Sequence, residues 1–317
     1  MKFNRRTFIK GMAVTSAAIP FFGINAAQVF EVTKKKYPIS FFTKPLDDFD
    51  LVFIAEALAM AGIDGFDLAV RPKGRVEPER ISNDLPKVIE ISKKYHLNTD
   101  MMVTSITNPF GTNTEHVLKT AAGLGIKHYR LGYYDYDFKE GIWKSLDKIK
   151  KNLEQLTKMN EDIGIQGGYQ NHSGTKVGSP IWDIWELIRD LPPDFMSSQF
   201  DIRHAVTEGA SSWILALQLL SKNIGSLAIK DFTWDVSGRK AKVVSVPLGE
   251  GIVDFNLFFT TLKELNINVP ITLHIEYPFF SKEEENVSLT QKQKIITAKI
   301  KKDTDFIRYN LAKFKLI

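Results

Sequence analysis

Short apolar runs alternate with longer amphipathic stretches along most of this chain. Eight apolar runs have the length and pattern of strands, at residues 39–43, 66–70, 98–104, 128–132, 165–170, 196–201, 226–231 and 271–276. Apolar residues recur at helical spacing after each of them, in residues 51–61, 78–95, 114–124, 141–163, 180–189, 210–220, 255–265 and 289–313. This alternation predicts parallel strands joined by helical crossovers.

Eight strand–helix units are what a closed (β/α)₈ barrel requires, so we predict a single α/β TIM barrel over residues 37–312. A doubly wound open sheet is the alternative. It is disfavoured because no Gly-x-Gly-x-x-Gly follows the first predicted strand, and we expect no nucleotide cofactor. Residues 232–246, rich in charge and valine, predict a small hairpin after the seventh strand.

The N-terminus has a different pattern. Arg5 and Arg6 precede Phe8 in a motif that resembles the twin-arginine export signal, and a weakly apolar run follows over residues 11–27. Pro20 and Gly23 interrupt this run, which makes it a poor membrane span. We therefore expect a signal peptide at residues 1–27, a periplasmic or otherwise exported protein, and no stable membrane span in the mature form.

Composition and charge remove several function classes. The 317 residues include no cysteine, which excludes disulfides, thiol nucleophiles and cysteine-ligated zinc. The net charge is +5, but the lysines are spread along the chain among acidic residues. That distribution predicts a solvated surface and no nucleic-acid partner.

Polar side chains stand at the ends of the predicted strands. In a TIM barrel the carboxyl ends of the strands build the active site, so these side chains are expected to line one pocket. The candidates are Asp67, Arg71, Arg130, Tyr133, Gln170, Asn171, His172, Asp201, Arg203, His204, Lys230, Asp231, His274 and Glu276, together with Glu250 from a nearby loop.

Four of these residues suggest specific chemistry. Asp201 can bind a cation and His204 can bind substrate or transfer a proton, unless the pair is only a loop cap and a surface histidine. Glu276 lies in an apolar run, where an unpaired carboxylate is costly, so a cation, arginine or substrate partner is expected. Lys230 can bind an anion, polarise a carbonyl or simply form an ion pair.

Other candidates carry weaker signals. His274 shares the strand face of Glu276 and is either a ligand or a packed core histidine. Arg130 needs an anionic or hydroxyl partner, from a substrate or from a salt bridge. Trp234 follows the seventh strand closely enough to stack on a sugar, whereas the tryptophans at helical positions are expected to pack in the core. Those tryptophans are Trp182, Trp185 and Trp213.

Several motifs recur at matching places in one known group of barrels. They are Asn171-His172, Asp201-x-x-His204, Ile229-Lys230-Asp231, Gly249-Glu250-Gly251 and Glu276. On these motifs the chain resembles the sugar phosphate isomerase/epimerase superfamily, the xylose isomerase-like TIM barrels, over roughly residues 37–312. In the metal-dependent epimerases of this superfamily, a Glu, an Asp, a His and a Glu from strands five to eight hold a divalent ion. The resemblance implies the same four positions for a metal site in this chain.

The chain matches only part of that ligand set. Asp201 and Glu276 stand at two of the four positions, and His204 matches a substrate-binding histidine. Gln170 replaces the glutamate of strand five, and Ala228 stands where strand seven would supply the histidine. With His172 or His274 as a substitute nitrogen ligand, the sequence still allows a bound Mn, Mg, Co or Zn ion.

The resemblance implies an isomerase or epimerase acting on a small keto-sugar. Glu276 would abstract a proton next to the carbonyl, and a metal, Lys230 or His204 would stabilise the enediolate. The remaining candidates would bind the carbohydrate: Arg71, Arg130, Gln170, Asn171, His172, Trp234 and Glu250. The alternatives are a lyase or hydratase on 3-keto-sugar derivatives and a non-catalytic sugar-binding barrel.

The sequence also allows a homo-oligomer.

Overall fold

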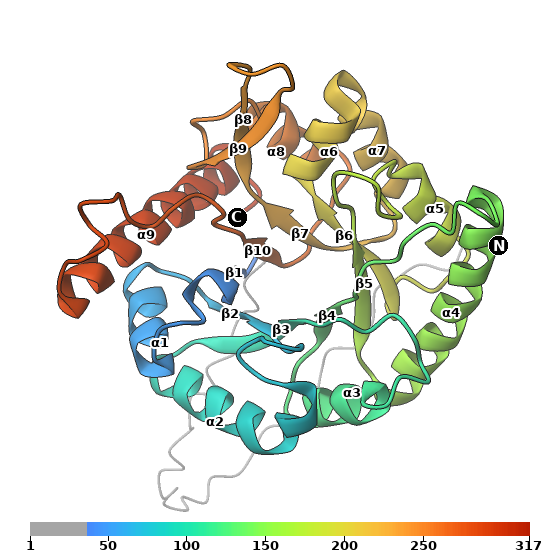
Figure 1. Ribbon diagram of the computed structural model, residues 1–317, viewed down its shortest axis with the longest axis horizontal. Coiled ribbons are helices and arrows are strands. Elements are labelled where there is room, and N and C mark those ends of the chain that lie inside the picture. Colours follow the sequence, from blue (N-terminus) through green and yellow to red (C-terminus); the bar gives the residue numbers. More distant parts are fainter. Residues whose placement is uncertain (1–36) are drawn as a thin grey trace, which may run out of the picture. The chain divides into compact units, whose positions relative to one another are not determined.

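The strands close into a parallel barrel. The computed structural model describes residues 37–317, in which eight strands pair in the closed order β1-β10-β7-β6-β5-β4-β3-β2. They are β1 (Ile39–Phe42), β2 (Gly65–Ala69), β3 (Asn98–Val103), β4 (His128–Arg130), β5 (Gln166–Gln170), β6 (Met196–Asp201), β7 (Ile224–Ile229) and β10 (Ile271–Leu273). The predicted (β/α)₈ barrel is confirmed, and Figure 1 shows the helices arranged around the strands.

The predicted helices are all present, with ends shifted by a few residues. They are α1 (Leu51–Met60), α2 (Ile81–Lys94), α3 (Thr114–Gly123), α4 (Ile142–Ile163), α5 (Trp182–Ile188), α7 (Trp213–Leu220), α8 (Phe255–Glu264) and α9 (Leu289–Lys313). Single 3₁₀ turns precede three helices, at η1 (Lys44–Leu46), η2 (Pro78–Arg80) and η3 (Ala210–Ser212).

One helix was not predicted. Helix α6 (Ile202–Gly209) begins directly after β6, where a loop was expected. The Asp201 carboxylate caps it by accepting a hydrogen bond from the backbone N–H of His204 at 3.1 Å. Such a cap satisfies one of the free N–H groups at a helix start. Asp201 therefore has a structural role as well as any chemical one.

Strand β10 is shorter than predicted. Its pairing with β1 ends at Leu273, and its pairing with β7 ends at the same residue. His274 and Glu276 consequently lie in the segment that leaves the barrel, not within the strand. This places the Glu276 side chain at the mouth, where it remains 37% exposed.

The predicted hairpin is also present. Strands β8 (Asp231–Asp235) and β9 (Lys242–Val246) pair antiparallel and are drawn in orange in Figure 1. The buried Asp231 carboxylate accepts backbone hydrogen bonds from Phe232, Gly249, Gly251 and Val253 at 2.8–3.2 Å. A Cβ at Gly251 would lie 2.2 Å from that carboxylate, so the close approach requires glycine. Asp231 thus anchors the loop that follows the hairpin.

The predicted export signal, residues 1–27, lies outside the described residues. Among residues 37–317, none of the helices has the length and apolar character needed to cross a membrane.

Candidate active site

Lys230 stands at the centre of a polar cluster at the carboxyl end of the barrel. It follows the last residue of β7, and its side chain is 4% exposed. Its Nζ lies 3.1 Å from Asp201 Oδ2, 2.7 Å from Glu276 Oε1 and 3.1 Å from His204 Nε2. An ammonium has three hydrogens to donate, so these three acceptors can use all of them.

Two negative and two positive charges balance in this cluster. Arg203, on α6, binds the second oxygen of Glu276, while Lys230 binds the first. Burial by itself would raise the pKa of Asp201, but Lys230 and Arg203 outweigh it and hold that pKa below its ordinary value. Burial likewise opposes Lys230 and Arg203 at Glu276, whose pKa falls to about 2. Both carboxylates are therefore ionised at neutral pH.

His204 is neutral. Burial and the adjacent Lys230 ammonium lower its pKa well below the ordinary value. The backbone N–H of Ser173 donates to His204 Nδ1 at 3.1 Å, and the Ser173 hydroxyl lies against the same nitrogen. The Lys230 ammonium approaches the other nitrogen, Nε2, so donors face the ring on both sides. His204 and Ser173 thus help to hold the ammonium in place.

Gln170 connects the cluster to strand β4. Its Oε1 accepts hydrogen bonds from Arg130 Nη1, at 2.6 Å, and from the Tyr133 hydroxyl, while its Nε2 donates to Asp201 Oδ2 at 2.8 Å. The partners fix this orientation, because arginine only donates and a carboxylate only accepts. A glutamate here would bring a second negative charge against Asp201, so the neutral amide suits a site without a cation between them.

Asn171 holds the end of β5 against the end of β6. Its Nδ2 donates to the Asp201 carbonyl at 2.9 Å, and its Oδ1 accepts from the Asp201 backbone N–H at 2.7 Å. The residue is 1% exposed. The structure therefore uses Asn171 to position Asp201, and its contact with a substrate stays a prediction.

His172 has a nitrogen available at the mouth. Its Nδ1 lies 2.8 Å from the Ser173 carbonyl, which can only accept, so the proton is on Nδ1. Burial lowers the pKa of His172, and Nε2 is left with a free electron pair. The ring lies 4.1 Å from the His204 ring and 4.9 Å, edge to face, from Tyr133.

We name the five residues Gln170, Asp201, His204, Lys230 and Glu276 the paired half of the mouth. A second group, from the first strands and from the segment after β10, is less well satisfied. We name it the unpaired half, and it consists of Phe42, Asp67, Arg71, Arg130 and His274.

The unpaired half surrounds the Phe42 ring. His274 stacks on Phe42 at 4.7 Å, and the guanidinium carbons of Arg71 and Arg130 lie 5.8 and 5.7 Å from the ring centroid. His274 Nε2 is 3.9 Å from Asp67 Oδ2, beyond hydrogen-bond distance. Three buried atoms of this half have no hydrogen-bond partner in the described structure: Asp67 Oδ1, Arg130 Nε and His274 Nε2.

The predicted metal ligands do not form a metal site. All four oxygens of Asp201 and Glu276 already accept hydrogen bonds or ion pairs from the protein. The third expected ligand, His274, stacks on Phe42 beside Asp67. In the part of the chain that the structure describes, no three His, Asp or Glu side chains are grouped to hold a metal. The donor set does not fit a resident divalent ion.

Two predicted sugar-binding residues lie outside this network. Glu250 forms an ion pair with Lys302 of α9, and its side chain is 51% exposed. Trp234, on β8, packs edge to face against Phe232 at 5.4 Å. Their contact with a carbohydrate stays a prediction.

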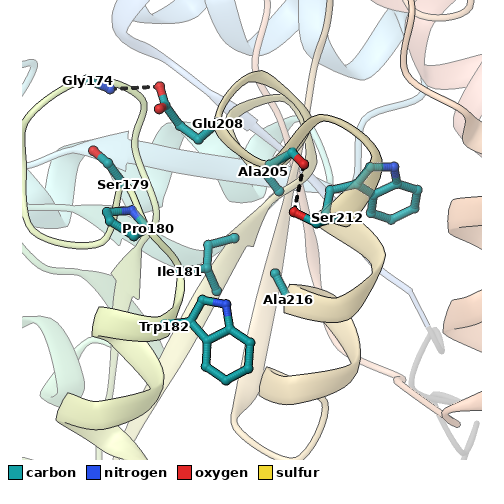
Figure 2. Close-up of a pocket in the computed structure, with 11 residues that line it drawn as sticks. Gly174, Ser179, Pro180, Ile181, Trp182, Ala205, Glu208, Ser212 and Ala216 are labelled. Carbon is teal, nitrogen blue, oxygen red and sulfur yellow. Dashed lines mark hydrogen bonds between the residues drawn. The ribbon is translucent and has the colours of Figure 1, made fainter.

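A cavity of about 320 Å³ lies behind the loop that carries Ser173. Figure 2 shows its walls, formed by residues 174–182 on one side and by α6 and α7 on the other. Glu208 on α6 accepts a hydrogen bond from the Gly174 N–H across the top. The prediction that Trp182 packs in the core is wrong: it lines this cavity and is 58% exposed.

Several residues that complete the site had no predicted role. Arg203 and Tyr133 were recognised as polar residues near strand ends, but not as partners of Glu276 and Gln170. Ser173 and Phe42 were missed. Phe42 ends the first strand, and its apolar side chain excluded it from a search for polar groups.

The fold is shared with solved barrels that include a sugar epimerase and a dehydratase. The IOLI protein, solved with a zinc atom, aligns with TM-score 0.65 and 16% identity over 87% of this chain and 99% of its own. A D-allulose 3-epimerase from Methylomonas sp. aligns with TM-score 0.60 and 17% identity over 87% and 98%. The probable 3-DHS dehydratase AsbF from Bacillus anthracis aligns with TM-score 0.57 and 15% identity over 83% and 97%. At these identities the likeness establishes the fold.

The sequence itself gives a family assignment. No curated protein matches the chain significantly. A profile of the xylose isomerase-like TIM barrels matches residues 55–293, which is most of the described barrel. The chain belongs to the xylose isomerase-like TIM barrel family.

Proposed function

We propose that this protein is an isomerase or epimerase that moves a proton next to the carbonyl of a keto-sugar, with Lys230 as the cation that stabilises the enediolate. The observation that carries the proposal is the position of Lys230 Nζ between Asp201, Glu276 and His204. A fixed positive charge beside a base is what enolisation requires.

Glu276 is the proposed base. It is ionised, partly exposed at the mouth and in contact with Lys230. A carboxylate with a pKa of about 2 is a weak base, so substrate binding has to loosen its ion pairs. When the substrate carbonyl oxygen accepts a hydrogen bond from Lys230, the ion pair between Lys230 and Glu276 weakens. The pKa of Glu276 then rises, and the carboxylate becomes a stronger base.

The step is a simple proton transfer. Glu276 takes the proton from the carbon next to the carbonyl, the electron pair of that C–H bond forms a C=C bond, and the π pair of the carbonyl moves onto its oxygen. Lys230 and Arg203 are close enough to Glu276 to stabilise the new negative charge. Return of the proton to the former carbonyl carbon, with transfer of the hydroxyl proton from one oxygen of the enediolate to the other, gives isomerisation, and return to the opposite face of the first carbon gives epimerisation.

His172 is the proposed second proton carrier. It is neutral and its Nε2 is free, so Nε2 has to take a proton from solvent before it can deliver one to the opposite face, and its ring lies tilted against that of His204 at 4.1 Å. In the metal-dependent epimerases that the chain resembles, two carboxylates carry the proton, and of these two only Glu276 is present here. An unlike pair, one carboxylate and one imidazole, also suits the loss or addition of water. A lyase or hydratase on an oxidised sugar is therefore the second candidate, and a dehydratase shares the fold.

Metal involvement belongs to the same proposal. The IOLI neighbour carries zinc, so the fold admits a metal. In this chain Gln170 and Ala228 remove two donors, and Lys230 uses the carboxylates that remain. We propose that Lys230 takes over the cation's task.

Export and assembly stay predictions. We propose that the substrate is a carbohydrate met outside the cytoplasm, on the basis of the signal predicted at residues 1–27. A homo-oligomer also stays a prediction.

Deuterium exchange tests the proposal. Chelator-treated protein is incubated in D₂O with D-allulose and with 3-keto-glucosides, and NMR follows the carbon next to the carbonyl. We expect exchange that the chelator does not affect and that Glu276→Gln lowers about 100-fold. Glu115→Gln, which breaks an exposed ion pair with Lys119, is the matched control and should leave the rate unchanged.

Three outcomes would count against parts of it. An unchanged rate in Glu276→Gln removes that residue as the base. Exchange that the chelator abolishes and Mn²⁺ restores removes Lys230 as the sole cation. Sugar binding with no exchange would favour a non-catalytic barrel.

A further inference from the structure

The two arginines of the unpaired half have no acidic partner. Within residues 37–317 neither Arg71 nor Arg130 forms an ion pair, although Arg203 and Lys230 nearby are both paired. Within the same residues the two guanidinium groups together make a single side-chain hydrogen bond, which Arg130 donates to the neutral amide oxygen of Gln170. Two guanidinium groups without acids are unusual at a mouth where the other charges balance.

Stacking does not satisfy these groups. Both guanidinium carbons lie within 6 Å of the Phe42 centroid, and Arg130 also lies 5.2 Å from the Tyr133 centroid. Aromatic contacts use the faces of a guanidinium, whereas its N–H groups point outward in its plane. Arg130 is 6% exposed, and its Nε has no acceptor. A buried donor left without a partner is costly.

The two arginines also repel each other. Burial and the charge of Arg130 lower the pKa of Arg71, and Asp47 and Asp67 oppose them only partly. Asp47 itself pairs with Arg75, and Asp67 lies below the mouth, bonded to Thr272. An anion between the arginines would remove this repulsion and accept the free N–H groups at the same time.

Gln170 places the arginines next to the proposed reaction centre. One amide group separates them, because Gln170 Oε1 accepts from Arg130 and Gln170 Nε2 donates to Asp201. The Tyr133 hydroxyl lies in the field of both sides: burial raises its pKa, the charge of Arg130 lowers it, and those of Asp201 and Glu276 raise it. A small substrate can therefore reach both groups.

We infer that Arg71 and Arg130 form an anion subsite, and that the substrate is a keto-sugar carrying an oxyanion group, a carboxylate or a phosphate. The inference rests on the proposed function for the reaction and adds the class of substrate. Arg71 keeps part of its surface exposed and receives the anion, while the buried Arg130 supplies the second donor.

Calorimetric titration at constant ionic strength tests this. The probes are D-glucuronate, D-glucose 6-phosphate, neutral D-glucose and inorganic phosphate. We expect one of the two anionic sugars to bind at least about tenfold more tightly than glucose. Which of them binds identifies the group as carboxylate or phosphate. Arg71→Gln should abolish that advantage, and Arg71→Lys should keep part of it.

Arg189→Gln is the matched control. Arg189 stacks on Trp185 at 4.6 Å outside the barrel mouth, so the variant removes the same charge from a similar stacked position. It should leave the binding of every probe unchanged. Circular dichroism verifies that each variant is folded.

Two results would overturn the inference. One is equal or absent binding of the anionic sugars relative to glucose, and the other is inorganic phosphate that binds as tightly as any sugar. Deuterium exchange separates this from the proposed function. Exchange on neutral keto-sugars without an anion preference removes the subsite alone, and an anion preference without exchange on any keto-sugar removes the reaction alone.

Discussion

The two halves of the barrel mouth differ in how their polar groups are satisfied. In the paired half every carboxylate oxygen of Asp201 and Glu276 accepts a hydrogen bond. In the unpaired half, buried atoms of Asp67, Arg130 and His274 have none, whereas within residues 37–317 none of the five residues of the paired half has such an atom. Beside the paired half, Arg203 Nε and the Oε1 of Gln199, which is in register with Gln170 on β6, also lack a partner. An unsatisfied buried group costs about 1–3 kcal/mol. The paired half is thus already organised, whereas the unpaired half gains most from a ligand.

Under the proposed function, a lysine in the paired half does the work that a metal does in other barrels of this fold. A barrel that holds a metal needs several acids around one site, as the resemblance to metal-dependent epimerases implies. Here the amide of Gln170 removes one acid, and the Lys230 ammonium supplies the positive charge. Lysine is a compact point charge with three donors, which suits a site with two carboxylates and one imidazole.

The largest expected effect follows the loss of that charge. Lys230→Met leaves Asp201 and Glu276 without their common partner, so we expect kcat to fall roughly 10²–10³-fold and the free energy of unfolding to fall by about 3 kcal/mol. Deuterium exchange and urea unfolding measure the two. Lys119→Met, from an exposed helix pair, should change neither.

Lys230→Met also tests the proposal that the Lys230 ammonium takes the place of a metal ion. With the ammonium gone, Mn²⁺ should bind between the two carboxylates and raise the melting temperature of Lys230→Met, but not that of the natural protein. An equal rise in the melting temperatures of both proteins would show that a metal binds beside Lys230. The paired half would then also gain from a ligand, and the contrast with the unpaired half would not hold.

A smaller effect distinguishes the halves directly. Asp201 and Asp67 are both fully buried, so the same change to asparagine can be made in each half. Asp201→Asn turns one carboxylate oxygen into a donor that faces other donors, and we expect a loss of about 3 kcal/mol in the free energy of unfolding. Asp67 accepts one side-chain hydrogen bond, from Thr272, and Asp67→Asn should cost under about 1 kcal/mol.

Urea unfolding of the two variants gives the answer. Equal losses would show that the halves do not differ in the way their hydrogen bonds indicate. Asp67→Asn has a second readout, because it removes a negative charge close to Arg71 and should tighten the binding of the anionic sugar.

The smallest expected effect is on acid stability. The pKa of Glu276 is about 2 in the folded protein and 4.5 in its ordinary state, so its ion pairs stabilise the protein above pH 4.5. That stability is lost as the pH falls from 4.5 toward 2. Glu276→Gln should remove this pH dependence. The part of the unfolding free energy that is lost with it is on the order of 1 kcal/mol, because solvent screens a partly exposed group.

Urea unfolding at several pH values tests this. His204 and His172 provide an internal reference, since their lowered pKa values make stability fall as the pH drops below 6.5 in both proteins. A variant whose stability between pH 4.5 and 2 still follows that of the natural protein would show that Glu276 is not paired in solution.

Much of the fold could be predicted because its signals are local. Strands buried on both faces appear as continuous apolar runs, and the crossover helices carry apolar residues at helical spacing. The end of β10 was misplaced, because an apolar run does not show where its neighbours stop pairing. Helix α6 was missed, because its start depends on Asp201, for which the sequence suggested a cation ligand or a loop cap and not a helix cap.

The chain pattern was enough to predict the barrel, the rim on which polar groups gather, and the presence of Gln170 and Ala228 where the resemblance implies metal ligands. The contacts that each polar group makes required the folded barrel. Lys230 meets Glu276 across a separation of 46 residues, and Arg130 meets Gln170 across 40. Such pairs form because barrel closure brings distant strand ends together, and one chain pattern does not contain those distances. The missing charge at Gln170 was visible in the sequence and Lys230 was a candidate there, whereas the contacts of Lys230 with Asp201, Glu276 and His204 appear only in the folded protein.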